Sequence, residues 1–303
     1  MVRGRLGKTL LGATAVSTLA AAGYVMYQER AAGKRPLPNP QNDSYALITG
    51  ASSGIGAEFA RQLAAAGFNL VLTARRADKL TALATELQTT YPITAKIIVA
   101  DLAQAEDVAR LEAEITALNL AVLVNNAGFG TTGGLLASDL TQQMAMLNVH
   151  VMAAMRLCRA ALPGMTERGG GVIINVSSIS AFFPFPGDVN YPASKAYLTV
   201  FSQALQAEVS ENGIIVQALC PGFTVTEFHD TTMMTQFDRQ NVPSVMWMTA
   251  AEVVTTSLHS LNPNRVVCIP GRRYQLMVAA ARSGLNDLIV KIGSATAWAR
   301  SYI

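Results

Sequence analysis

Short apolar segments alternate with helix-like segments between residues 45 and 270, and this alternation limits the possible folds more than any other feature of the sequence. The apolar segments are residues 45–49, 69–74, 95–100, 121–124, 171–176, 214–219 and 266–269. Helical apolar spacing occurs at residues 57–66, 78–88, 107–117, 140–162, 191–211 and 250–260. Strands joined through helices form parallel sheets that are covered on both faces. We therefore predict an α/β fold in which residues 45–272 form a doubly wound, mostly parallel sheet of seven strands.

The first apolar segment runs into a glycine-rich turn, T-G-A-S-S-G-I-G, at residues 49–56. Glycines allow the backbone to approach a phosphate at the N-terminus of a helix. The spacing G-x-x-x-G-x-G differs from the common dinucleotide fingerprint, but a strand precedes this turn and a helix follows it. We predict a Rossmann-like nucleotide-binding turn that contains Gly50, Ser52, Ser53, Gly54, Ile55 and Gly56.

The end of the second apolar segment indicates which nucleotide is bound. In NAD-binding sheets an acidic residue about 20 residues after the glycines binds the ribose hydroxyls. Here Ala74 stands at that place, and Arg75 and Arg76 follow it. Because guanidinium groups bind phosphate oxygens in pairs, we predict NADP(H), with both arginines near its 2′-phosphate.

Other candidate ligand-binding residues also follow predicted strands directly. They are Asp101, Asn125, Ser178 and Pro221. In open parallel sheets, ligands bind beyond the carboxyl ends of the strands. We therefore expect these residues to meet at one site.

Tyr191 and Lys195 are four residues apart and share one face of a predicted helix. A free tyrosine has a pKa of about 10, and a close cation favours the phenolate and so lowers the pKa. A hydroxyl such as that of Ser178 can hold a carbonyl oxygen while charge develops on it. Combined with a hydride source, this arrangement suits the reduction of a ketone.

Together these motifs resemble those of the short-chain dehydrogenase/reductase family. The resemblance rests on the glycine turn, N-N-A-G at residues 125–128, Asn148, Ser178, Y-P-A-S-K at residues 191–195 and P-G-F-T-V-T at residues 221–226, in the family's order. It covers residues 44 to 270 and implies an NADP(H)-dependent oxidoreductase that acts on carbonyl or alcohol groups.

The resemblance also implies a role for each matching position. Tyr191 would be the general acid in reduction, Ser178 rather than Ser177 would orient the carbonyl, and Lys195 would bind the nicotinamide ribose. Asn148 would hold a water that relays protons to solvent. Further cofactor contacts would come from Asp101, Asn125, Ala127, Gly128, Pro221, Gly222, Thr224 and Thr226.

Apolar residues concentrate where the family covers its substrate. They are Phe182, Phe183, Phe185, Phe223, Phe228, Met233, Met234, Phe237, Val242, Val245, Met246, Trp247 and Met248. They predict either ordinary core and subunit contacts or a pocket for a lipophilic ketone, such as a 3-oxoacyl compound. A hydroxysteroid- or retinol-type alcohol dehydrogenase and a non-catalytic NADP-binding membrane scaffold are the alternative functions.

The N-terminal segment differs in charge from the rest of the chain. Residues 1–35 hold six basic residues and one acid, whereas the remainder holds 17 basic and 19 acidic residues. The near-neutral remainder gives no indication of nucleic-acid binding. Residues 9–27 form a run of 19 residues without charge, about the length that spans a bilayer. We predict a membrane anchor; an organelle presequence, a cleaved export signal and a helix lying on a surface are the alternatives.

The remaining segments and residue types set the expected surroundings. Residues 36–44 predict a linker, and residues 273–303 predict an apolar helical tail that lies on a membrane or closes a homo-oligomer. Cys158, Cys220 and Cys268 lack metal-ligand spacing and indicate a reducing compartment, so we predict no metal site. We expect a membrane-associated protein with its catalytic domain facing the cytoplasm, with an organelle as the alternative location.

Overall fold

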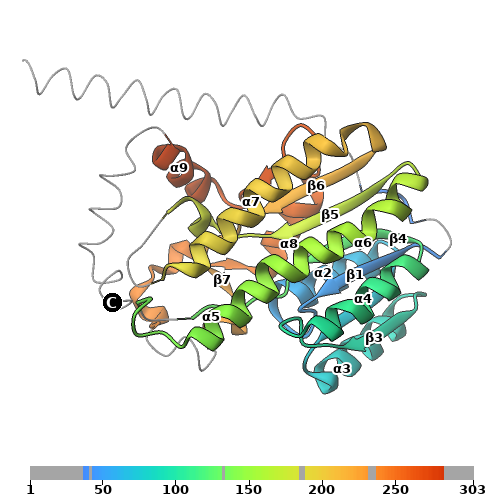
Figure 1. Ribbon diagram of the computed structural model, residues 1–303, viewed down its shortest axis with the longest axis horizontal. Coiled ribbons are helices and arrows are strands. Elements are labelled where there is room, and N and C mark those ends of the chain that lie inside the picture. Colours follow the sequence, from blue (N-terminus) through green and yellow to red (C-terminus); the bar gives the residue numbers. More distant parts are fainter. Residues whose placement is uncertain (1–36, 41–42, 132–133, 184–187, 231–236, 283–303) are drawn as a thin grey trace, which may run out of the picture.

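The computed structural model describes residues 37–40, 43–131, 134–183, 188–230 and 237–282. Its centre is a seven-stranded sheet in the order β3-β2-β1-β4-β5-β6-β9, in which all neighbouring strands are parallel (Figure 1). The strands are β1 (Tyr45–Thr49), β2 (Asn69–Ala74), β3 (Ala95–Val99), β4 (Leu120–Asn125), β5 (Gly171–Val176), β6 (Ile214–Leu219) and β9 (Val267–Cys268). The predicted sheet is confirmed.

Helices cover both faces of this sheet. They are α2 (Gly54–Ala65), α3 (Ala77–Thr90), α4 (Ala105–Ala117), α5 (Leu140–Leu147), α6 (Ala154–Glu167), α7 (Asn190–Glu208), α8 (Ala250–His259) and α9 (Arg272–Ala280). Short helical turns are η1 (Asn148–Ala153), η2 (Ile179–Phe182), η3 (Ser210–Asn212), η4 (Glu227–Asp230), η6 (Arg239–Asn241) and η7 (Ser244–Met246). In Figure 1, α4, α6 and α7 cross in front of the sheet, and α2, α3 and α8 pack on the other face.

Successive strand residues divide between two apolar layers. In β1, Ala46 and Ile48 pack with α2 and α8, whereas Leu47 packs with α4 and α6. All three side chains are fully buried. Side chains of a strand alternate between its faces, so a strand that is apolar at every position fits only a sheet that is covered on both sides.

The strand order changes direction between β1 and β4. The chain moves from β1 outward through β2 to β3 on one side, and then from β4 outward to β9 on the other. The two connections leave β1 and β4 in opposite directions, which opens a crevice at the carboxyl ends of these strands. The turns that carry the candidate site residues meet there.

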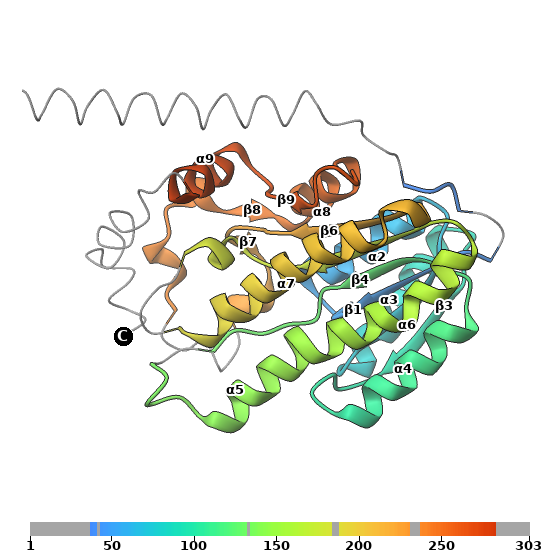
Figure 2. The ribbon, with the colours of Figure 1, turned by 45° about the horizontal axis from the view of Figure 1, so that its top comes forward.

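The first residues of the predicted tail form α9 and pack against the catalytic domain. The boundary expected between residues 272 and 273 cuts through the start of α9, whose Tyr274 is fully buried. Its phenol accepts the N–H of Phe223 at 3.0 Å and donates to the carbonyl oxygen of Met246. Figure 2 shows α9 beside the pair β7 (Thr224–Val225) and β8 (Met248–Thr249). The first turns predicted as tail therefore belong to the core, because they close the segment after β6.

Several predicted features lie outside the described residues. They are the leader, residues 283–303 of the tail, and the candidates Phe185, Met233 and Met234. Within the described part of the chain, no helix has the length and apolar character needed to cross a membrane.

Candidate active site

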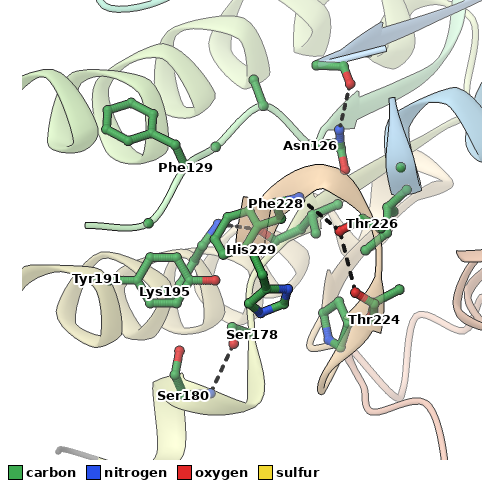
Figure 3. A pocket seen from close by; sticks show the side chains of 18 of the residues that line it. Asn126, Phe129, Ser178, Ser180, Tyr191, Lys195, Thr224, Thr226, Phe228 and His229 are labelled. Carbon is green, nitrogen blue, oxygen red and sulfur yellow. Dashed lines mark hydrogen bonds between the residues drawn. The ribbon is translucent and has the colours of Figure 1, made fainter. Parts of the chain in front are cut away.

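A large cavity lies beyond the carboxyl ends of the central strands, and its volume is about 850 Å³. Gly50, Arg76 and Asp101, which follow three successive strands, line one end of it. Tyr191 and Phe228 line the other end, which Figure 3 shows from close by. Ligand sites of proteins commonly enclose about 300–1,000 Å³, so this cavity is large enough for sizeable organic ligands.

The glycine turn at the first end of the cavity is shaped for an anion. Gly50 and Gly54 have φ values of +66° and +57°, a region that favours glycine. A Cβ on Gly50 would lie 2.8 Å from Nδ2 of Asn126, and one on Gly54 would lie 2.9 Å from Cγ2 of Thr226. Ser53 makes no side-chain cap at the start of α2. Because the first N–H groups of a helix lack intrahelical partners, this turn can bind a phosphate.

Arg76 is held over the same turn. Its Nη2 lies 2.9 Å from the hydroxyl oxygens of both Ser52 and Ser53, and its Nη1 lies 2.8 Å from Glu227. The other carboxylate oxygen of Glu227 lies 2.6 Å from Nζ of Lys79. Hydrogen bonds from Lys79 and Arg76 lower the pKa of Glu227 to about 2. A phosphate group bound beside the turn would therefore meet a positioned guanidinium.

Tyr191, Lys195 and Ser178 come together at the other end of the cavity. Nζ of Lys195 donates to the carbonyl oxygen of Val176 at 2.9 Å and lies 5.5 Å from the centre of the Tyr191 ring. The Ser178 hydroxyl faces the Tyr191 phenol and favours its ionised form, which lowers the pKa of Tyr191. The hydroxyl of Ser177 instead donates to the carbonyl oxygen of Lys195 at 2.7 Å. Ser177 therefore anchors α7, which leaves Ser178 as the serine directed at the tyrosine.

Burial decides the charge states of these groups. It raises the pKa of the Tyr191 phenol above its usual range, and the opposing effect of the Ser178 hydrogen bond is smaller. Burial also lowers the pKa of Lys195 to about 7. The pKa of Tyr191 was predicted to lie below that of free tyrosine, but it is raised, because desolvation dominates and the neighbouring Asp188 adds to it. Tyr191 is protonated at neutral pH, which is the state that can donate a proton.

His150 lies in η1, with its ring centre 5.7 Å from that of Tyr191. Nε2 accepts the N–H of Phe129 at 3.2 Å, so the proton of the neutral ring is on Nδ1, 2.9 Å from Oγ of Ser194. The Ser194 hydroxyl donates to the carbonyl oxygen of Tyr191 at 2.7 Å. Burial and the charge of Lys195 hold the pKa of His150 well below its usual range. A neutral histidine thus ties the loop after β4 to the first turn of α7.

A family model described as short chain dehydrogenase matches residues 44–236, which is more than half of the chain. The chain belongs to the short-chain dehydrogenase family. The match covers the glycine turn, the arginines after β2, and the tyrosine and lysine of α7, so the family resemblance predicted from the sequence is confirmed.

Individual members of this family are similar to the chain over most of its length. A very-long-chain 3-oxoacyl-CoA reductase of Anas platyrhynchos is 36% identical over 231 residues, 75% of this chain and 70% of that protein. A 17-beta-hydroxysteroid dehydrogenase type 3 of Danio rerio is 35% identical over 222 residues, 72% of this chain and 69% of that protein. A short-chain dehydrogenase from Sphingobium yanoikuyae, solved in complex with NADPH, has a TM-score of 0.71 at 32% identity and covers 84% of this chain and 96% of that one.

Most of the predicted site residues of this short-chain dehydrogenase line the cavity. They are Gly50, Ser52, Ser53, Gly54, Ile55, Arg75, Arg76, Asp101, Ala127, Gly128, Ser178, Tyr191, Lys195, Pro221, Gly222, Thr224 and Thr226. Among the residues that the structure describes, no group of three or more His, Cys, Asp or Glu side chains is placed to hold a metal ion.

Three predicted residues do not line the cavity. Asn148 is exposed, and its Nδ2 lies 3.4 Å from the carbonyl oxygen of Ala103. Asn125 is buried and donates to Oδ1 of Asn175 at 2.8 Å. Gly56 serves packing, since a Cβ there would lie 2.3 Å from the carbonyl oxygen of Gly50.

Sequence reasoning missed two site residues, Asn126 and His150, which are close in sequence to Asn125 and Asn148. Asn126 lines the cavity in place of Asn125 and donates from Nδ2 to the carbonyl oxygen of Thr49 at 2.9 Å. His150, two residues after Asn148, contacts the tyrosine that Asn148 was predicted to serve. The paired asparagines of N-N-A-G were a signal for Asn126, whereas an isolated histidine gave none.

Proposed function

We propose that this chain is an NADPH-dependent carbonyl reductase that acts on a lipophilic ketone, with 3-oxoacyl thioesters as the favoured substrate class. The observation that carries the proposal is the shared cavity. One end presents the glycine turn and Arg76, and the other presents Ser178, Tyr191 and Lys195. A dinucleotide along this cavity would reach from the arginine to the tyrosine.

The residues present fit NADPH. The glycine turn and the start of α2 would hold the pyrophosphate, Arg76 with Arg75 the 2′-phosphate, and Asp101 the adenine. Bound in this way, the cofactor supplies a hydride to the carbonyl carbon of the substrate. The NADPH complex of the Sphingobium relative supports this choice.

Ser178 and Tyr191 would act on the oxygen of the substrate. Their hydroxyls converge and would donate hydrogen bonds to the carbonyl oxygen as negative charge develops on it. Tyr191, kept protonated by burial, would then transfer its proton to that oxygen. Lys195, with a pKa of about 7, lies near enough to stabilise the resulting phenolate and to take part in its reprotonation.

Apolar side chains form the wall on the substrate side. Phe183, Phe228, Val242, Met246 and Met277 line this part of the cavity. Such a wall favours a substrate with an extended hydrocarbon portion. The name of the Anas relative, a very-long-chain 3-oxoacyl-CoA reductase, supports this class.

A hydroxysteroid-type dehydrogenase is the second candidate. The Danio relative carries that name, and the same apolar wall suits a steroid. The two candidates differ in the shape of the substrate and not in the chemistry at Tyr191. A non-catalytic NADP-binding scaffold remains the third hypothesis, but a buried and protonated Tyr191 that contacts Ser178 has no use in it.

The test is a substrate screen with the full-length protein. NADPH oxidation is followed with long-chain 3-oxoacyl thioesters, with 17-oxosteroids and with simple hydrophobic ketones. We expect the highest kcat/KM for the thioesters. Preference for the steroids would favour the second candidate, and NADPH binding without turnover of any ketone would favour the scaffold.

We also propose that residues 1–35 attach the protein to a membrane and that the catalytic domain forms a homo-oligomer. The oligomer is supported by large apolar side chains that the described surface exposes on neighbouring helices. They are Leu140 and Met144 of α5, Met152 of η1, and Tyr197 and Val200 of α7. Membrane flotation of chains with and without residues 1–35, and the mass of the soluble form in solution, test the two points separately.

A further inference from the structure

His229 lies at the centre of an aromatic cluster beside the substrate part of the cavity. We define the cluster as Phe223, Phe228, Phe237 and Trp247 around this histidine. The ring of His229 stacks on Phe237 with 4.5 Å between ring centres, and it meets Phe228 and Trp247 edge-on at 5.2 and 5.3 Å. The stack and the two edge contacts fix the orientation of the imidazole.

The histidine points toward the reacting end of the cavity. It lines the cavity itself, and Figure 3 shows its imidazole in the same pocket as Ser178 and Tyr191. Phe228 contacts both Tyr191 and His229, since the centre of its ring lies 5.9 Å from that of the Tyr191 ring and 5.2 Å from that of the His229 ring.

The two nitrogens of this imidazole have different surroundings. Nδ1 is buried and has no hydrogen-bond partner. Burial, assisted by the charge of Arg239, lowers the pKa of His229 to about 4, so the ring is neutral at pH 7. A proton on Nδ1 would leave a buried donor unpaired, which is costlier than an unpaired acceptor. The proton therefore resides on Nε2, which is left as a donor for a ligand in the cavity.

A 3-oxoacyl thioester has a second carbonyl oxygen that needs such a donor. Its two carbonyl carbons are separated by a single methylene, so the thioester oxygen stays close to Tyr191 while the ketone is reduced. An oxygen that enters an apolar pocket without a partner loses its hydrogen bonds to water. The aromatic cluster would impose this cost unless the imidazole of His229 donates, since the indole N–H of Trp247 already donates to the carbonyl oxygen of Val242.

We propose that Nε2–H of His229 donates a hydrogen bond to the thioester carbonyl oxygen and thereby selects 3-oxoacyl thioesters over simple ketones. This inference rests on the proposed function and names the residue that reads the acyl group. His229 is a specificity-determining residue in this account, because the proton transferred to the ketone oxygen comes from Tyr191.

The experiment compares two substrates of equal chain length in wild type and in variants. One substrate is a 3-oxoacyl thioester, and the other is the matching β-keto thioether, in which a methylene replaces the thioester carbonyl. His229→Phe retains an aromatic ring in the cluster and removes both nitrogens. His229→Leu is a second variant in case the phenyl ring is not tolerated. Trp247→Phe is the control, since it alters the same cluster at a residue that does not line the cavity.

We expect the ratio of kcat/KM for thioester over thioether to fall about tenfold in His229→Phe and in His229→Leu, as for one net hydrogen bond. The ratio should stay within about twofold in Trp247→Phe. An unchanged ratio in both histidine variants, or an equal fall in the control, would overturn the role of His229 and leave the proposed function standing. Wild type that reduces neither compound would overturn the proposed function and this inference with it.

Discussion

The most informative perturbation is the removal of the His150 imidazole. His150→Ala leaves the N–H of Phe129 and the hydroxyl of Ser194 without their partner. Each orphaned buried group costs about 1–3 kcal/mol. Ser194 still has the carbonyl oxygen of Tyr191 as an acceptor, so its share is the smaller one. We therefore expect the free energy of unfolding to fall by about 2–4 kcal/mol, including the loss of ring packing.

The same variant should slow turnover more than it weakens substrate binding. The Phe129–His150–Ser194 connection fixes the turn that carries Tyr191, and a shift of about 1 Å in a catalytic group can cost roughly 100-fold in rate. We expect kcat to fall between about 10-fold and 100-fold while KM stays within about threefold. The pH profile should keep its shape, because His150 is already neutral in the wild type.

The measurements are urea denaturation and steady-state kinetics on the same preparations. His150→Gln is the matched control, since its amide offers both an acceptor for Phe129 and a donor for Ser194, and it should recover most of the lost stability and rate. Wild-type stability and kcat in His150→Ala would refute the reasoning, and so would a variant in which only the pH profile changes.

Three further predictions concern the cofactor end, the lysine and the closing helix. Arg76→Ala should raise the KM for NADPH at least about tenfold, as for the loss of a charged hydrogen bond, and should change the KM for NADH by no more than about twofold. An unchanged ratio of the two KM values in steady-state kinetics would contradict the assignment of Arg76 to the 2′-phosphate. The pKa of Lys195 is about 7 in the folded protein, whereas that of an unperturbed lysine is 10.5. The unfolded chain therefore binds more protons between these pH values, and the free energy of unfolding should rise by about 1 kcal/mol per pH unit. Lys195→Met should remove this slope between pH 7.5 and 9.5 in denaturation experiments, and an identical slope in wild type and variant would show that the lysine is not buried as described. Gly222→Ala should destabilise the protein by about 1–3 kcal/mol, because its Cβ would lie 2.0 Å from the Tyr274 ring. Gly134→Ala is the control, since its Cβ would meet nothing within 4 Å. Equal unfolding midpoints for the two variants would show that α9 does not close over this turn.

The sheet was predictable because its signal is repeated. The strands are short apolar runs, and most of them are followed within two residues by a glycine or a polar residue. Errors at single strand ends do not change the order of elements. The β7–β8 pair was missed since each strand has two residues, too few to show a period. The fully buried Tyr274 was assigned to the tail because only three residues separate the end of β9 from the start of α9, and sequence spacing does not show which residues close a core.

The errors within the site have a common physical origin. Neighbouring residues of a strand point to opposite faces, so the motif N-N-A-G does not reveal whether Asn125 or Asn126 faces the cavity. On a helix, residues two apart point in nearly opposite directions, and the π-helical turn η1 changes the register at the point where Asn148 was placed. The π-helical turn places His150 beside Tyr191, and the rings that surround His229 come from residues spread over positions 223–247. Contacts of this kind appear only in three dimensions.

The central claim is that the Tyr191 hydroxyl delivers the proton in a reduction driven by NADPH. Its most direct test is Tyr191→Phe, assayed for NADPH binding and for 3-oxoacyl thioester reduction on one preparation, since phenylalanine retains the ring contacts with His150 and Phe228. The account predicts an NADPH dissociation constant within about threefold of wild type and a kcat that is lower by about 100-fold or more. Reduction at the wild-type rate by this variant would contradict it.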